Sequence, residues 1–157
     1  EEGIGYKIAI EILNEGPVGF GAQMVGLAQG AFDRALAYTF ERQQFGKPIA
    51  KFQGMQFQMA QIATEIEAAR LMVYNAARLK EEGRPFTKQA AMAKLYSSQA
   101  AERAAGRAIE WGCGQGYSRE QGMAEYWRDS KIGAIYEGTS NIQLNTIFNL
   151  TAKEQGL

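Results

Sequence analysis

The sequence lacks histidine, contains a single cysteine and has no net charge, because 17 lysines and arginines balance 17 aspartates and glutamates. Without histidine, Ser-His and Cys-His nucleophile pairs and His-based metal sites are excluded within this chain. Acid–base chemistry must therefore come from carboxylates, Tyr, Lys or Cys. The lone Cys113 cannot form an intrachain disulfide, so nothing indicates an oxidising compartment. A neutral chain also gives no electrostatic argument for a nucleic-acid partner.

Long apolar runs are absent as well. No apolar stretch reaches the roughly 18 residues that a membrane-spanning helix requires, so no membrane span is predicted. The first residues, Glu1 to Gly3, include no starting Met and no signal or transit pattern, and we expect the chain to begin inside a longer polypeptide. The 157 residues, 46% of them hydrophobic, suit one domain with one core.

Proline is scarce and occurs only at positions 17, 48 and 85. Between these positions, helix-favouring residues dominate and no β-branched run alternates with period two. Apolar spacings of three and four predict four main helices over about 6–43, 51–82, 86–111 and 139 onward, and a short helix over 121–130. The sequence thus predicts an all-α fold, an up-and-down four-helix bundle.

Local signals refine this prediction. We expect Pro17 to kink or break the first helix. Gly83 suits the cap position after the second helix. Residues 45–50 are expected to form a loop, and Gly112 to Tyr117 a turn. The third helix carries a stripe of small residues that allows close helix approach, namely Ala90, Ala93, Ala100, Ala104 and Ala108.

The segment from Glu41 to Gly46 is the first of three that carry residues a plain bundle does not require. Arg42 lies at a predicted helix end, and arginine forms forked hydrogen bonds to phosphates. Phe45 offers a flat face for stacking. The alternative interpretation is an ordinary helix C-terminus with a favourable cation and a glycine stop.

The second such segment runs from Trp111 to Tyr117 and contains three glycines in five residues. Glycine lets a backbone approach a ligand closely. A flexible connector would have the same composition. No predicted strand precedes the segment, so it is not a dinucleotide-binding fingerprint.

The third segment runs from Ile135 to Asn141 and places the acid Glu137 just before a predicted helix start. The helix N-terminus stabilises the carboxylate, whereas burial beside Ile135 and Tyr136 destabilises it. A base whose basicity rises when a substrate excludes water suits proton abstraction. The alternative is a simple capping acid.

Six motifs follow one another along the chain. They are Leu-Asn-Glu-Gly at 13–16, Glu-Arg-x-x-Phe-Gly at 41–46, Phe-Gln-x-x-Gln at 52–56, Gly-x-Gly-Tyr at 114–117, Arg-Asp-x-Lys-Ile at 128–132 and Ile-Tyr-Glu-Gly-Thr-Ser-Asn-Ile-Gln at 135–143. In this order and spacing, the sequence resembles the acyl-CoA dehydrogenase family over essentially its whole length. The resemblance is strongest to short/branched-chain members, which also follow Ile-Gln with Leu-Asn.

The resemblance implies that residues 1–157 are a single C-terminal helical-bundle domain, and that an N-terminal helical domain and a middle β domain are absent from this chain. Members bind FAD, are usually homotetramers built as dimers of dimers, and oxidise the Cα–Cβ bond of an acyl-CoA to a trans-2-enoyl-CoA. Electrons then pass to an electron-transfer flavoprotein. The implied pathways are fatty acid metabolism and branched-chain amino acid catabolism. The implied location is the mitochondrial matrix in a eukaryote or the cytoplasm in a bacterium, and not outside the cell.

By motif, the resemblance makes Glu137 the catalytic base that removes the substrate α-proton, while its backbone N–H helps to hold the thioester carbonyl. The implied FAD-binding residues are Arg42, Phe45, Gln53, Glu110, Trp111, Gly112, Cys113, Gly114, Thr139, Ser140 and Asn141. Arg42 and Gln53 would reach the FAD of a neighbouring subunit, so that FAD is shared across the dimer interface. The implied acyl-CoA-binding residues are Tyr6, Asn14, Glu15, Gly16, Pro17 and Gly138.

Some positions depart from the usual family pattern. Pro17 stands where the family usually has Arg, Cys113 where it has a second Gly, and Glu125 where it often has Lys or Arg. Isovaleryl-type members place the base on the first helix, where this chain has Gly16, which favours Glu137. The alternatives are an acyl-CoA oxidase, and a non-catalytic oligomerisation module or pseudoenzyme. The isolated chain is expected to be inactive, because the middle domain carries most of the flavin site.

Overall fold

The computed structural model describes residues 3–157, with the side chains of 6–15 left undescribed. Its elements, in chain order, are α1 (Gly5–Glu41), β1 (Gln43–Gln44), β2 (Lys47–Pro48), the 3₁₀ turn η1 (Ile49–Lys51), α2 (Gln53–Glu81), α3 (Thr87–Tyr117), α4 (Met123–Ser130), the 3₁₀ turn η2 (Lys131–Ala134) and α5 (Ser140–Glu154). The predicted all-α class is confirmed. No helix among the described residues is both long and apolar enough to cross a bilayer.

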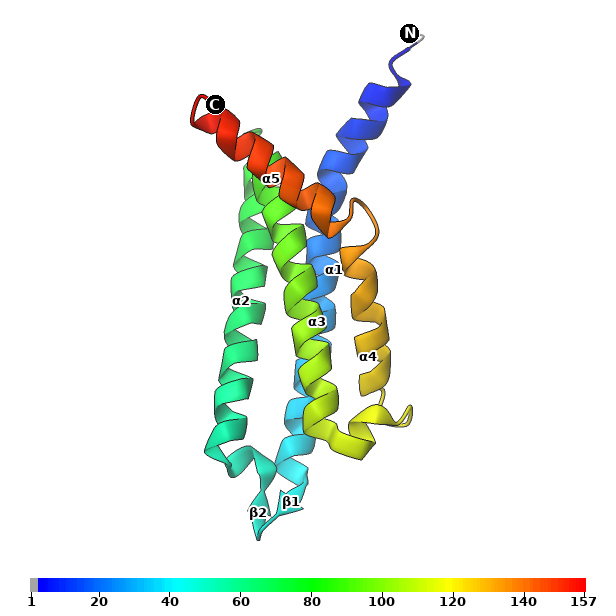
Figure 1. Ribbon diagram of the computed structural model, residues 1–157, viewed down its shortest axis with the longest axis vertical. Coiled ribbons are helices and arrows are strands. Elements are labelled where there is room, and N and C mark those ends of the chain that lie inside the picture. The colour runs from blue at the N-terminus through cyan, green and yellow to red at the C-terminus, as the bar shows by residue number, and fades with distance from the viewer. Residues whose placement is uncertain (1–2) are drawn as a thin grey trace.

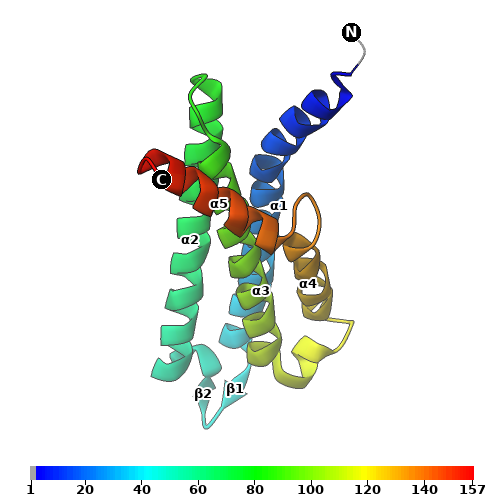
Figure 2. The ribbon, with the colours of Figure 1, turned by 45° about the horizontal axis from the view of Figure 1, so that its top comes forward.

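The helices α1 to α4 run alternately down and up, while α5 crosses the bundle obliquely near one end (Figure 1). The same crossing is visible when the top of the molecule is turned forward (Figure 2). The helix α3 lies at the centre and contacts α1, α2, α4 and α5. The short α4 is thus the fourth antiparallel helix of the bundle, and α5 packs across α3.

The core follows the predicted periodicity. On α3, the alanine stripe is buried throughout, with Ala93, Ala104 and Ala108 fully inaccessible. Small side chains here let α1 and α3 approach closely along their length. On α2, one face is buried from Met59 to Leu79 at spacings of three and four.

The structure bears on three local predictions. Of the kink or break expected at Pro17, a break does not occur, since α1 is one helix from Gly5 to Glu41. One missing backbone donor costs about 3 kcal/mol, which the long packing of α1 on α3 outweighs. The loop expected at 45–50 is replaced by a tight hairpin that pairs Gln43 with Pro48. The turn expected at Gly112 to Tyr117 is confirmed only at Cys113, where φ 50° and ψ −132° interrupt the helical path, because the residues after this kink return to helix up to Tyr117.

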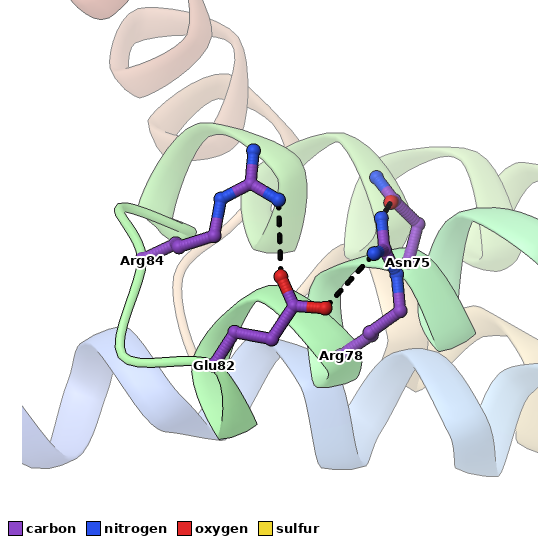
Figure 3. Close-up of polar contacts among 4 residues, drawn as sticks. All are labelled: Asn75, Arg78, Glu82 and Arg84. Atoms are coloured by element: carbon purple, nitrogen blue, oxygen red, sulfur yellow. Dashed lines mark hydrogen bonds and ion pairs between the residues drawn. The ribbon is translucent and has the colours of Figure 1, made fainter.

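The connection between α2 and α3 begins with a C-terminal cap at Gly83. Gly83 has φ 66°, and its N–H donates to Lys80 O at 3.0 Å, while the Arg84 N–H donates to Leu79 O at 2.9 Å. This pair of bonds is the Schellman arrangement, so the cap predicted at Gly83 is confirmed. Figure 3 shows Glu82 held between Arg78 and Arg84, at 2.9 and 3.0 Å.

Candidate active site

The segment Ile135 to Thr139 connects η2 to α5 and carries Glu137 in a strained turn. Glu137 has φ 51° and Gly138 has φ 85°, so two successive residues are left-handed. A non-glycine residue in such a conformation costs about 1–3 kcal/mol and persists only when its surroundings impose it. The turn lies at the opposite end of the bundle from the β1–β2 hairpin (Figure 1).

The Glu137 carboxylate faces α1 at a position without a side chain. A Cβ placed on Gly16 would lie 3.1 Å from Glu137 Oε2, tighter than an ordinary contact. Gly16 therefore leaves the space that the carboxylate fills. The structure thus brings together the predicted base and one of the predicted substrate-binding positions, although they are far apart in the sequence.

Tyr136 anchors the turn to α1. Its ring packs edge-on against Phe20, with centroids 4.4 Å apart, and its hydroxyl donates to Gln23 Oε1 at 2.5 Å. Burial raises the pKa of the Tyr136 hydroxyl, and the negative charge of Glu137 raises it further. The phenol therefore stays neutral and keeps its donor role beside the carboxylate.

Two buried side chains that sequence reasoning missed hold the backbone on either side of Glu137. Lys94 of α3 is 1% exposed, and its Nζ donates to Tyr136 O at 2.9 Å and Gly138 O at 2.7 Å. Gln143 of α5 is 4% exposed, and its Nε2 donates to Glu137 O at 3.3 Å and Gly138 O at 3.1 Å. The carbonyl oxygens of residues 136, 137 and 138 thus all accept hydrogen bonds from these two side chains.

A signal for Lys94 was present in the sequence. It lies four residues after Ala90 and four before Ser98, on the predicted buried face of the third helix. A charged residue on such a face is rare unless it is paired. Burial lowers the pKa of the Lys94 ammonium, and the charge of Glu137 opposes that shift.

The remaining residues of the turn prepare the start of α5. Thr139 is its N-cap, and the Thr139 hydroxyl accepts a bond from the Ile142 N–H at 3.4 Å. This confirms the predicted helix start, with Ser140 and Asn141 in the first turn. The φ of 85° at Gly138 favours glycine, and a Cβ there would lie 2.7 Å from Gln143 Nε2 and so would displace the amide that holds the turn.

A second cluster of predicted residues gathers near the hairpin, around a cavity of about 490 Å³. Its lining includes Arg42 and the run Trp111, Gly112, Cys113 and Gly114. The indole N–H of Trp111 donates to Gln58 Oε1 at 3.0 Å, which fixes the ring. Segments that are distant in the sequence thus share one pocket.

Other predicted residues lie apart from both clusters. Phe45 is 91% exposed at the hairpin tip, and Gln53 begins α2. Glu110 pairs with Arg107 at 2.5 Å along a different groove between α2 and α3. Pro17 is buried within α1. The side chains of Tyr6, Asn14 and Glu15 lie outside the described residues.

Cys113 occupies a backbone conformation that suits glycine, with φ 50° and ψ −132° at the kink of α3. We expect Cys113→Gly to raise the free energy of unfolding by about 1 kcal/mol, because the strain of about 1–3 kcal/mol is partly offset by the entropy of glycine. Cys113→Ser keeps the Cβ and serves as the matched control. Urea unfolding of the chain, followed by circular dichroism, measures both. Equal stability of the Gly and Ser variants would contradict the strain.

These features define a helical-bundle domain that holds the Glu137 carboxylate in a strained turn near one end and has a cavity lined in part by Arg42 near the other. Residues 3–149 match the family described as "Acyl-CoA dehydrogenase, C-terminal domain". The chain belongs to the acyl-CoA dehydrogenase family and corresponds to its C-terminal domain. The resemblance expected from the motifs is therefore confirmed.

Individual relatives agree with this assignment. The chain is 59% identical over 145 residues to the mitochondrial short/branched chain specific acyl-CoA dehydrogenase of Rattus norvegicus, covering 92% of this chain and 34% of the relative. The butyryl-CoA dehydrogenase structure of Megasphaera elsdenii superposes with a TM-score of 0.95 at 45% identity, covering 97% of this chain and 40% of that one.

A chain in a structure described as the electron transferring flavoprotein of Acidaminococcus fermentans also superposes with a TM-score of 0.95, at 44% identity. The match covers 96% of this chain and 40% of that chain. The present sequence thus spans between about a third and two fifths of the relatives that it matches.

Proposed function

We propose that this chain is the C-terminal catalytic domain of an FAD-dependent acyl-CoA dehydrogenase that converts a short or branched-chain acyl-CoA to its trans-2-enoyl-CoA. The observation that carries the proposal is the Glu137 carboxylate, set in a strained turn against the gap left by Gly16. Strain held in place by buried hydrogen bonds is typical of functional sites. The full-length enzyme would add the N-terminal helical and middle β domains.

In the proposed reaction, Glu137 takes the proton from the carbon next to the thioester. The negative charge that develops on the thioester oxygen is met by the Glu137 backbone N–H, an oxyanion-hole device. Bound FAD supplies the acceptor for the hydride that leaves the β-carbon. Loss of one proton and one hydride forms the Cα–Cβ double bond, and the carboxylate ends protonated.

Two regions of the structure suit an anionic dinucleotide such as FAD. The N-terminus of α5 offers backbone N–H groups together with the exposed Thr139 and Asn141, a favourable place for a pyrophosphate. At the other end, Arg42 lines the cavity beside the Cys113 kink. One chain would then contribute to two FAD sites, which is what sharing FAD across the interface of a homotetramer requires.

Three further parts of the proposal rest on relatives. The electron transferring flavoprotein structure supports such a protein as the electron acceptor. The butyryl-CoA dehydrogenase and the short/branched chain enzyme support a small acyl group on CoA as the substrate. The mitochondrial relative supports residence in the mitochondrial matrix for a eukaryotic source, and the cytoplasm would apply to a bacterial one.

The experiment that tests this function compares the full-length enzyme with the isolated chain. We expect the full-length enzyme to purify with FAD, and its flavin to be bleached anaerobically by acyl-CoAs of short or branched chain. The 157-residue chain alone is expected to show no turnover, because it spans only 34% of the rat relative and would lack the middle domain that we infer to carry most of the flavin site. A full-length protein without flavin, or a flavin that no acyl-CoA reduces, would contradict the proposal.

A further inference from the structure

The buried Lys94 has no role in the function proposed above, yet its surroundings are unusual. Its ammonium is held by two neutral carbonyls, Tyr136 O and Gly138 O, at 2.9 and 2.7 Å. A buried lysine is costly unless it gains strong hydrogen bonds, and charged donors make the strongest ones. The two carbonyls belong to the residues on either side of Glu137.

The first of these carbonyls shares a peptide unit with the Glu137 N–H. No cis peptide bond occurs among the described residues, so the C=O and N–H of this unit point in opposite directions. Since Lys94 binds the carbonyl side, the Glu137 N–H points away from Lys94. Among the described residues, no side-chain or backbone oxygen accepts a hydrogen bond from the Glu137 N–H.

A cation on the carbonyl also changes the strength of the donor. Hydrogen bonds in a chain polarise one another, and the effect is larger in a low-dielectric interior. An ammonium that draws electron density toward Tyr136 O makes the Glu137 N–H a stronger donor. The same unit would receive the thioester oxygen, whose charge rises as the α-proton leaves.

We propose that Lys94 is a positioning residue that orients and polarises the Tyr136–Glu137 peptide, so that the Glu137 N–H stabilises the enolate-like oxygen of an acyl-CoA thioester. This inference rests on the proposed function. The second bond, to Gly138 O, fixes the following peptide and with Gln143 holds the left-handed pair Glu137 and Gly138. Lys94 thus acts through the backbone and does not touch the substrate.

A purely structural role for Lys94 would stabilise the turn without affecting charge on the substrate. The two roles differ in the acidity of the bound substrate. An acyl-CoA analogue with sulfur in place of the β-methylene has no β-hydride to give, so its reaction stops once the α-proton has moved. In FAD-loaded enzyme, the change in absorbance as this anion forms would report the pKa of the α-proton.

The test uses full-length, FAD-loaded enzyme and this sulfur analogue in a pH titration. Removing an entire oxyanion donor costs about 10²–10³ in rate, so weakening one in Lys94→Met is expected to lower kcat by about 10–100-fold. The pKa of the bound analogue should rise by about one to two units, because a loss of anion stabilisation that slows the rate 10–100-fold corresponds to that shift in pKa. KM should stay within about threefold, because the ground-state thioester carries little charge.

Ser98→Ala is the matched control. Ser98 also lies on α3, one turn from Lys94, and its single hydroxyl proton is shared between Lys94 O at 2.7 Å and Gly133 O at 3.0 Å. These bonds hold the α3 backbone and η2, and neither reaches the Lys94 ammonium or the Glu137 peptide. It should lower stability and leave the pKa of the analogue unchanged. If Lys94→Met does not retain FAD, Lys94→Gln, which loses the charge and keeps an amide donor, carries the test.

The outcomes separate the two proposals. An analogue pKa within about 0.3 units of wild type, in whichever Lys94 variant retains FAD, would overturn the role of Lys94 alone. An equal shift in Ser98→Ala would also overturn it, because the effect would then be general loosening. A Glu137→Gln enzyme that still deprotonates the analogue would instead overturn the proposed function.

Discussion

Replacing Glu137 by glutamine in the full-length enzyme is expected to leave FAD bound and to slow flavin reduction by about 10³-fold or more, near the upper range of acid–base contributions. Glutamine keeps the size of the side chain and fills the same space beside Gly16, where a Cβ would lie 3.1 Å from Glu137 Oε2. It cannot accept a proton from carbon. Rapid mixing with a saturating acyl-CoA, followed at the flavin absorbance, measures the rate.

Two further variants make this result specific. Glu125→Gln removes an exposed acid from α4 and should leave the rate unchanged. Glu137→Asp keeps a carboxylate but withdraws it by one methylene, and it should fall between wild type and the glutamine variant. Near-normal reduction in Glu137→Gln would mean that another group is the base.

Moving the carboxylate to α1 is the second change with a large expected effect. Because a side chain on Gly16 would begin beside the Glu137 carboxylate, Gly16→Glu combined with Glu137→Gly should return a carboxylate to nearly the same place. We expect Glu137→Gly alone to lose about 10³-fold or more in rate, and the double variant to recover about 10–100-fold of that loss.

The control for this relocation lies on the same helix. Gly19 is exposed and a Cβ there meets nothing within 4 Å, so Gly19→Glu with Glu137→Gly restores the charge but not its position. This Gly19 double variant should recover none of the rate that Glu137→Gly loses. Equal recovery in the Gly16 and Gly19 versions would show that general charge, and not placement, supports turnover. Gly16→Glu in the presence of Glu137 should reduce the rate, because two adjacent carboxylates raise the pKa of one of them.

The regular parts of the fold were predictable because they depend on local patterns. The alanine stripe of α3 and the cap at Gly83 follow from spacing and from the conformational freedom of glycine. The start of α5 followed from the hydroxyl of Thr139. The local sequence around Glu137 is equally compatible with a capping acid and with a base. The resemblance to a known family was therefore needed to single out Glu137.

The unpredicted features depend on contacts across the fold. The hairpin needs both Phe45 and Gly46 at positive φ, at 52° and 78°, and phenylalanine gives no hint of this. The kink at Cys113 places a residue other than glycine in a conformation that glycine prefers. Lys94 is buried because its partners come from 42 and 44 residues further along the chain, which no local pattern reveals.

Exchange of the substrate α-hydrogen with solvent tests the central claim most directly, because it reports proton removal without hydride transfer. The sulfur analogue, labelled with deuterium at the α-carbon, is incubated with full-length enzyme in ordinary water, and loss of the label is followed by mass spectrometry. The account predicts rapid loss with wild type and Glu125→Gln, and loss with Glu137→Gln slowed by about 10³-fold. Loss at the wild-type rate with Glu137→Gln would contradict it.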